Sequence, residues 1–143
     1  MLFRSEPLTE GWHDTGDIVT IDSGGFISIR GRAKRFAKIG GEMVSLAAVE
    51  AMAASLCPGC AVAAVAMPDA RKGEKILLAT TAAGATRQAL SVHMRALGAT
   101  ELMVPSQVEI AHTIPLLGSG KTDYPAVTKL FNKVDQPEEV ATR

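Results

Sequence analysis

Apolar and polar residues alternate in two short stretches near the start of the chain. In residues 17–21 and 26–30 the apolar side chains recur at close to every second position, which is the period of a β-strand. The residues between the two stretches, Asp22-Ser23-Gly24-Gly25, favour a turn. The pattern therefore predicts a β-hairpin. Two strands are too few for a stable sheet, so we expect this hairpin to be a piece separate from the rest of the chain.

The next stretch, residues 31–41, has no consistent period. It is charged, it begins with Gly31 and ends with Gly40-Gly41, and it lies between two segments that have regular patterns. Such a stretch is typical of a hinge or of a loop that forms part of a site.

Apolar residues at helical spacing follow directly. Ser45 is a candidate N-cap, and Pro58-Gly59 ends the periodic segment. The apolar positions that recur three or four residues apart are Leu46, Val49, Met52, Ala53 and Leu56. This spacing predicts a helix with one buried face.

Two further segments predict helices. One begins after Thr86, a candidate cap, and runs through Leu97 to a stop at Gly98. Its expected buried face consists of Leu90, Met94 and Leu97. The other covers residues 124–131, where Pro125 is tolerated because it falls in the first turn.

The remaining regular segments read as strands. Residues 61–67 are almost continuously apolar and predict a buried strand, and residues 75–81 predict a second strand that pairs with it. Residues 107–111 predict a short third strand, residues 115–121 a Gly-containing loop, and residues 135–143 a disordered polar tail. Helices packed against a small sheet of about three strands make an α+β domain, here preceded by the hairpin.

Composition narrows the class of protein. The 143 residues carry 15 Lys and Arg against 15 Asp and Glu, so the basic excess of a nucleic-acid-binding protein is missing. With 47% hydrophobic and 21% charged residues, the chain reads as globular. Its apolar runs are shorter than the roughly 20 residues of a membrane-spanning helix. The first ten residues lack the apolar core of a secretory signal, so we expect a cytoplasmic protein.

The two cysteines form a single CxxC motif, Cys57-Pro58-Gly59-Cys60. Such a motif can be a redox pair or half of a zinc site. A second cysteine pair is missing, and the three histidines show no metal-ligand spacing to this one. We therefore expect a helix-ending turn with two incidental thiols and no bound metal.

Three other motifs have both a functional and an ordinary explanation. Gly11-Trp12-His13-Asp14-Thr15-Gly16-Asp17 can hold a carboxylate at the start of a strand, or it can simply be a turn. The cations of residues 31–41 suit phosphates, although a solvated run of charge is the commoner explanation. Pro115-Leu116-Leu117-Gly118-Ser119-Gly120-Lys121-Thr122 ends like a phosphate-binding P-loop, but Pro115 stands where that motif requires glycine. Lys121 is otherwise a compact, mobile cation.

The order of these motifs resembles the C-terminal end of adenylate-forming enzymes, the superfamily of acyl-CoA synthetases, luciferases and peptide-synthetase adenylation domains. The resemblance runs from about Gly11 to Phe131. Within the superfamily, Gly31-Arg32-Ala33-Lys34-Arg35 and Pro-Leu-Leu-Gly-Ser-Gly-Lys look most like the synthetase part of bifunctional acyl-acyl-carrier-protein synthetase/2-acylglycerophosphoethanolamine acyltransferases. The resemblance implies a two-step reaction. A fatty acid first attacks the α-phosphate of Mg²⁺-bound ATP, and a thiol of CoA or acyl carrier protein then displaces AMP.

The resemblance also implies roles for individual residues. Asp17 and Arg32 would bind the nucleotide, with the Asp17 carboxylate accepting hydrogen bonds from the ribose hydroxyls. Lys34 falls at the hinge about which the family's C-terminal domain rotates between the two steps. Lys121 would be the catalytic lysine that bridges the carboxylate and the α-phosphate. Gly40 and Gly41 would lie along the pantetheine tunnel, and Lys38 is a candidate second lysine.

The same resemblance implies a domain organisation. Residues 1–30 would be the end of the large N-terminal adenylation domain, and residues 31–134 the mobile C-terminal lid domain. The family's phosphate loop, adenine pocket and acyl pocket lie upstream of the motifs found here, so we expect the large domain as a partner and the isolated chain to be inactive. The alternative is a non-catalytic module that docks a carrier protein or complements a separately encoded large domain.

Overall fold

The structure is a computed structural model that describes residues 11–132. The chain divides into two units between Arg35 and Phe36, five residues beyond the boundary that the motifs predict. The expected disordered tail, residues 135–143, lies outside the described residues. No helix between residues 11 and 132 is long and apolar enough to cross a membrane.

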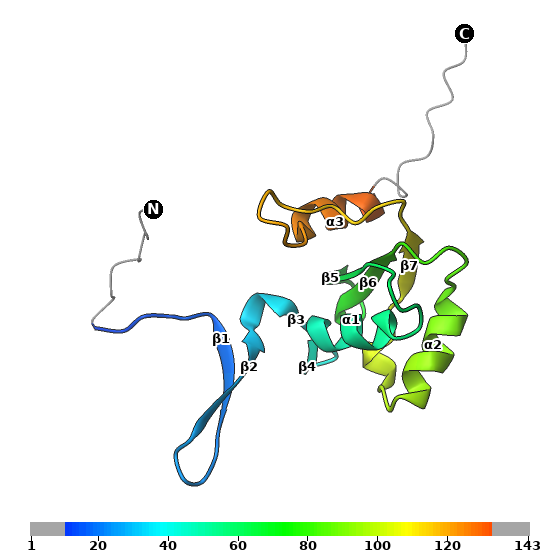
Figure 1. The fold of residues 1–143 in the computed structure, drawn as a ribbon. Coiled ribbons are helices and arrows are strands. Elements are labelled where there is room, and N and C mark those ends of the chain that lie inside the picture. The colour runs from blue at the N-terminus through cyan, green and yellow to red at the C-terminus, as the bar shows by residue number, and fades with distance from the viewer. Residues whose placement is uncertain (1–10, 133–143) are drawn as a thin grey trace. The chain divides into compact units, whose positions relative to one another are not determined.

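The N-terminal unit contains the predicted hairpin (Figure 1). Strand β1 (Asp17–Ile21) pairs antiparallel with β2 (Ile27–Arg32), and the register shifts between Ile18 and Val19. The Asp22 side chain closes the turn, because its Oδ1 accepts hydrogen bonds from the N–H groups of Gly24 and Phe26 at 2.9 and 3.0 Å. A short 3₁₀ turn, η1 (Ala33–Arg35), follows β2.

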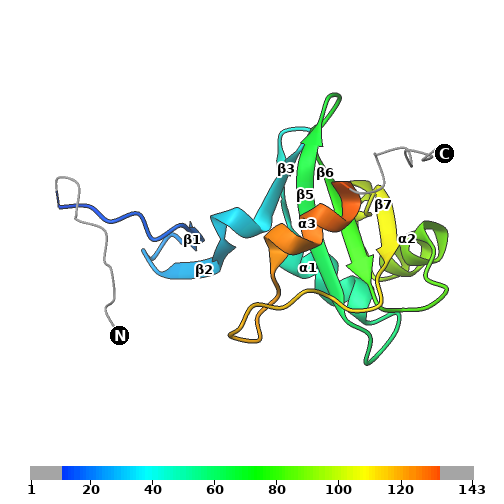
Figure 2. The same cartoon turned by 90° about the horizontal axis from the view of Figure 1, so that it is seen from above.

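The second unit contains a mixed sheet (Figure 2). Strand β5 (Val62–Asp69) pairs antiparallel with β6 (Gly73–Thr80) along its whole length, as the sequence predicts. Strand β7 (Gln107–Ile110) pairs parallel with the far part of β6. Strands β3 (Phe36–Ile39) and β4 (Glu42–Ser45) form a hairpin that joins the sheet where Ile39 meets Gly73.

The β3–β4 hairpin corrects the expectation of an irregular loop over residues 31–41. Within this stretch Ala37 and Ile39 are buried and Lys38 is exposed, so β3 does alternate, but over only four residues. The sheet accordingly has five strands, where the sequence predicted about three. The fold class is the expected one of small sheets and a few helices.

Ser45 and Thr86 cap their helices as the sequence predicts, and Asp123 caps a third helix for which no cap was predicted. Helix α1 (Leu46–Ala54) begins after Ser45, whose Oγ accepts a hydrogen bond from Ala48 N–H at 3.2 Å. Helix α2 (Arg87–Ala96) begins after Thr86, whose Oγ1 accepts one from Ala89 N–H at 3.1 Å. Helix α3 (Tyr124–Asn132) has the same kind of bond at 3.1 Å, from Ala126 N–H to Asp123 Oδ1. Each bond satisfies an amide that has no partner within its helix.

The sheet of the second unit is covered on both faces. Figure 1 shows α3 on one side and α1 with α2 on the other. Successive residues of a strand point to opposite faces, so Ile76 and Leu78 pack with α1 and α2, whereas Leu77 and Ala79 pack with α3. This double burial explains why β5 and β6 read as continuous apolar runs. Leu97 is 50% exposed, which corrects the predicted buried face of α2, because the helix ends one residue earlier.

Candidate functional site

Asp17 and Arg32 face each other at the open end of the β1–β2 hairpin. They are paired in register, and Arg32 Nε lies 3.2 Å from Asp17 Oδ1. A second nitrogen of the guanidinium donates to the carbonyl of Thr15 at 2.5 Å. The Arg32 side chain remains 67% exposed and that of Asp17 22% exposed. The structure therefore brings together the two predicted nucleotide-binding residues and leaves the guanidinium accessible.

A pocket of about 520 Å³ opens beside this pair. Its lining combines backbone around Gly16 with cationic side chains, and the residues are Asp14, Thr15, Gly16, Arg32, Lys34 and Arg35. The turn before β1 is fixed by its own side chains, since Asp14 Oδ1 accepts from Gly16 N–H at 2.8 Å. Three cations around one pocket suit an anionic ligand such as a phosphate group. Lys34, the predicted hinge residue, thus shares a pocket with Arg32 and with Arg35, another of the cations that the sequence places in residues 31–41.

Gly40 and Gly41 form the turn between β3 and β4. Both have positive φ, 57° and 86°, a conformation that glycine adopts without strain and that two-residue hairpin turns require. A Cβ atom at either position would meet no other atom within 4 Å. The turn geometry by itself accounts for both glycines, and their place along a pantetheine tunnel stays a prediction.

Lys38 lies on β3 next to this turn. Its side chain is exposed, and its backbone N–H donates to Glu74 Oε2 at 2.5 Å. Gly40 N–H donates to the carbonyl of Lys72 at 2.8 Å. The nearby β5–β6 turn is held by Asp69, because the N–H groups of Arg71 and Lys72 donate to its carboxylate. These hydrogen bonds lower the pKa of Asp69 below its usual value.

Lys121 lies on an exposed loop that the backbone closes on itself. Leu116 and Thr122 form a β-bridge, and Leu117 N–H donates to the carbonyl of Lys121 at 2.7 Å. Gly120 turns the chain with a φ of 83°. The Lys121 side chain is exposed, as are Leu116 and Leu117. Lys121 thus lies on the surface of a defined loop, as the predicted catalytic role requires. The role itself stays a prediction.

A half-buried hydrogen-bond network anchors the helix that follows this loop. The Tyr124 hydroxyl, at the start of α3, donates to Glu50 Oε1 of α1 at 3.1 Å. The same oxygen accepts from Ala64 N–H of β5 at 2.9 Å. Glu50 therefore links α1, β5 and α3, and its partner Tyr124 lies three residues after Lys121. Sequence reasoning missed both Glu50 and Tyr124. Glu50 is 14 positions from Ala64 and 74 positions from Tyr124 in the sequence, so the three residues meet only in the folded protein.

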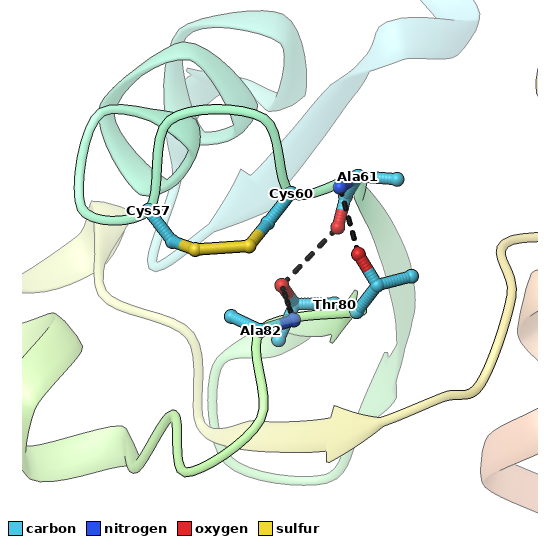
Figure 3. Close-up of a disulfide and its surroundings, with 6 residues drawn as sticks. Cys57, Cys60, Ala61, Thr80 and Ala82 are labelled. Atoms are coloured by element: carbon cyan, nitrogen blue, oxygen red, sulfur yellow. Dashed lines mark hydrogen bonds between the residues drawn. A yellow bond between two sulfur atoms is a disulfide. The ribbon is translucent and has the colours of Figure 1, made fainter.

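The CxxC motif differs from the sequence expectation. The two cysteines lie in the turn after α1, as predicted, but their sulfurs form the disulfide Cys57–Cys60 (Figure 3). The turn brings them together, since Cys60 N–H donates to the carbonyl of Cys57 at 3.0 Å. Nowhere in residues 11–132 do three or more His, Cys, Asp or Glu side chains gather in a way that could hold a metal ion.

Comparison with known proteins finds sequence similarity to CoA ligases. The chain is 31% identical over 116 residues to 3-methylmercaptopropionyl-CoA ligase of Ruegeria pomeroyi, an alignment that covers 80% of this chain and 22% of the relative. It is 33% identical over 118 residues to a salicylyl-CoA synthase/salicylate adenylyltransferase of Streptomyces, covering 80% and 21%.

One solved structure extends the likeness to the fold. A fatty acyl CoA synthetase of Mycobacterium tuberculosis superposes with a TM-score of 0.66 and 27% identity, over 89% of this chain and 26% of the synthetase. No protein-family model matches the chain. The chain spans about a fifth of the length of the curated relatives it matches.

Proposed function

Since this chain has the fold of the C-terminal domain of adenylate-forming enzymes and is similar in sequence to AMP-forming acyl-CoA ligases, we propose that it acts as the mobile C-terminal lid of such a ligase. The ligase would join a carboxylic acid to ATP, releasing pyrophosphate, and then pass the acyl group to a thiol, releasing AMP. The lid would present one face to the active site in the first step and another in the second.

The observation that carries this proposal is the exposed Lys121 on its closed loop. In the first step negative charge is shared between the attacking carboxylate and the α-phosphate, and an ammonium placed between them stabilises the transition state. Lys121 is suited to this task because its side chain is not engaged in the core of its own unit. The proposal assigns it as the catalytic residue.

Asp17 and Arg32 are proposed to hold the nucleotide. A carboxylate accepts several hydrogen bonds, so Asp17 can keep its contact with Arg32 and also receive the two ribose hydroxyls. Arg32 and Lys34 line one pocket, where they would lie near the phosphates of ATP. The large N-terminal domain would hold most of the ATP and its Mg²⁺ ion. Lys34 is also the proposed hinge, at the end of the N-terminal unit.

The second step is proposed to use the β3–β4 hairpin. The absence of side chains at Gly40 and Gly41 leaves open space around their turn, which suits a narrow pantetheine arm passing beside it. Lys38 is a candidate second lysine on the same strand. For the acid we propose a fatty acid, and for the thiol either CoA or an acyl carrier protein; the motifs favour the acyl-carrier-protein synthetase branch.

A large N-terminal domain is the proposed partner in a cytoplasmic enzyme. The hairpin supports this, because four of its apolar side chains are more than 60% exposed; they are Ile21, Phe26, Ile27 and Ile29. A two-stranded hairpin gains little stability alone. A covering domain would bury this apolar surface and stabilise the hairpin.

The test is a fusion in which this chain replaces the matching region of the R. pomeroyi ligase. We expect Lys121→Ala to lower adenylation of the ligase's own acid by about 100-fold or more, the usual effect of removing one transition-state charge partner. Thioester formation from supplied acyl-adenylate should be nearly unchanged. The matched control is Lys129→Ala, which removes a different exposed lysine that lies on α3. Equal loss in both half-reactions, or none in either, would contradict the role of Lys121 and favour a non-catalytic docking module.

A further inference from the structure

The Cys57–Cys60 disulfide is not used by the proposed ligase chemistry. It lies in the turn that joins α1 to β5, and both cysteines are half-buried. The two residues between them, Pro58 and Gly59, are exposed. A soluble thiol compound can therefore reach this turn from solvent.

The two cysteines have different surroundings. Cys57 borders a small cavity whose other lining is mostly apolar and includes Leu78 and Leu90, and Cys60 does not border it. The approach of a charged thiolate to an apolar cavity is unfavourable because the thiolate must shed its water. Attack from outside is therefore favoured at Cys60.

The Cys57–Cys60 pair lies at a different end of its helix from the cysteine pair of enzymes that oxidise other proteins. Their reactive cysteine lies at a helix N-terminus, where backbone N–H groups stabilise a thiolate. Cys57 instead follows the C-terminus of α1, where the carbonyl groups carry partial negative charge. We therefore expect the disulfide form of this pair to be favoured over its thiolate form. Such a pair is a poor oxidant of other proteins, and a strong reductant is needed to reduce it.

We propose that Cys57–Cys60 is a reversible thiol–disulfide site, reduced by dithiols and re-formed by an oxidised thiol compound. This inference rests on the proposed function in one respect, the cytoplasmic location. In that compartment most thiols are kept reduced, and the disulfides that form there are usually transient, catalytic or redox-sensing.

The reaction is a double exchange. One thiolate of the dithiol attacks Sγ of Cys60, the Cys57–Cys60 bond breaks, and Cys57 leaves as a thiolate that takes up a proton. The second thiol of the reductant then attacks the mixed disulfide and releases Cys60, which is also protonated. The reductant leaves as a disulfide, having supplied both electrons, and the protein has gained two thiols.

The structure indicates which part of the chain responds. Directly after Cys60, the Ala61 carbonyl accepts a hydrogen bond from Thr80 Oγ1 at 3.1 Å (Figure 3). It also accepts one from Thr81 N–H at 3.0 Å, and the Ala61 N–H donates to Thr81 Oγ1 at 2.9 Å. None of these bonds involves a cysteine, so we expect them to hold the chain before β5 after the disulfide is reduced as well. Reduction should therefore speed amide hydrogen exchange in residues 56, 57, 59 and 60 and leave the Ala61 amide, which donates to Thr81, protected.

The experiment is a redox titration of the full 143-residue chain in mixtures of reduced and oxidised dithiothreitol, with thiols trapped by a maleimide and counted by mass. We expect one reversible transition between no and two modified thiols, with a midpoint that does not depend on protein concentration because the bond is intramolecular. Hydrogen exchange on the two end states should change only before Ala61.

Two single substitutions test the direction of attack. With oxidised glutathione, Cys57→Ser, which keeps Cys60, should form the mixed disulfide several-fold faster than Cys60→Ser, which keeps Cys57. Equal rates, or a faster reaction of Cys57, would overturn the assignment of Cys60 as the attacked sulfur. The site itself is refuted if both thiols stay free in excess oxidant, or if the bond yields to dithiothreitol only after the chain is unfolded. Neither readout involves ATP or an acid, so it can fail while the proposed ligase role stands.

Discussion

The hydrogen bond between Tyr124 and Glu50 can be removed without removing the aromatic ring. Tyr124→Phe deletes the hydroxyl that lies 3.1 Å from Glu50 Oε1 and leaves α3 packed on β5 through Val127 and Phe131, which are 0% and 3% exposed. Hydrogen bonds to a charged group contribute about 1.5–3 kcal/mol when buried. Tyr124 and Glu50 are only half-buried, so we expect less, about 1 kcal/mol, the value of a typical intramolecular hydrogen bond.

A double-mutant cycle with Glu50→Gln isolates the part of this contribution that depends on the charge of Glu50. Glu50→Gln keeps one side-chain carbonyl oxygen, which can still accept from both Tyr124 and Ala64, so it alters the charge and keeps the contacts. For a domain of this size each kcal/mol shifts the melting temperature by about 4–8 °C. Tyr124→Phe should therefore lower the Tm by several degrees, and by less in the Glu50→Gln background. If Tyr124→Phe melts like the unaltered chain in both backgrounds, the bond does not stabilise α3 and the reasoning fails.

Two further predictions concern stability. Leu78, on β6, is 1% exposed and packs with α1 and α2, so Leu78→Ala should lower the free energy of unfolding in urea by about 2–5 kcal/mol. Leu116→Ala, at a 61% exposed position, should change it by less than about 0.5 kcal/mol. The pKa of Asp69 is lowered by the N–H groups of Arg71 and Lys72, so the carboxylate stabilises the fold above its unfolded-state pKa and this contribution disappears as the pH falls through the lowered value. Asp69→Asn should accordingly reduce the difference in Tm between neutral and strongly acidic pH, and an unchanged difference would contradict this account.

Local signals in the sequence determined the helices well. Ser45 and Thr86 were recognised as caps because the side chain that satisfies a free amide lies within three residues of it. The β5–β6 pair was recognised for a similar reason, since a short turn at Gly73 joins two apolar runs. Where one element decides its own boundaries, the residue pattern is sufficient.

The features that were missed depend on contacts between distant residues. The β3–β4 hairpin is too short to show a period, although Gly40-Gly41 between Ile39 and Glu42 is the signal that could have revealed its two-residue turn. The disulfide depends on the curvature of the chain after α1, which the spacing of two cysteines does not fix. Glu50 accepts hydrogen bonds from both β5 and α3, and no local sequence pattern predicts these contacts.

The candidate site was predicted unevenly for the same reason. The pairing of Asp17 with Arg32 follows from the hairpin, but its register depends on the irregularity between Ile18 and Val19. The exposure of Lys121 follows from the glycines on its loop. The pocket lined by Arg32, Lys34 and Arg35 depends on the 3₁₀ turn after β2. The sequence pattern did not predict this turn.

The central claim is that this chain supplies the mobile lid of an acid-activating ligase. Its most direct test is ATP–pyrophosphate exchange by the R. pomeroyi ligase after removal of the region that this chain matches, measured before and after fusion to the chain. The account predicts exchange that is very low in the truncated enzyme, returns in the fusion, and is lost again with Lys121→Ala. A folded fusion that exchanges no faster than the truncated enzyme would contradict it.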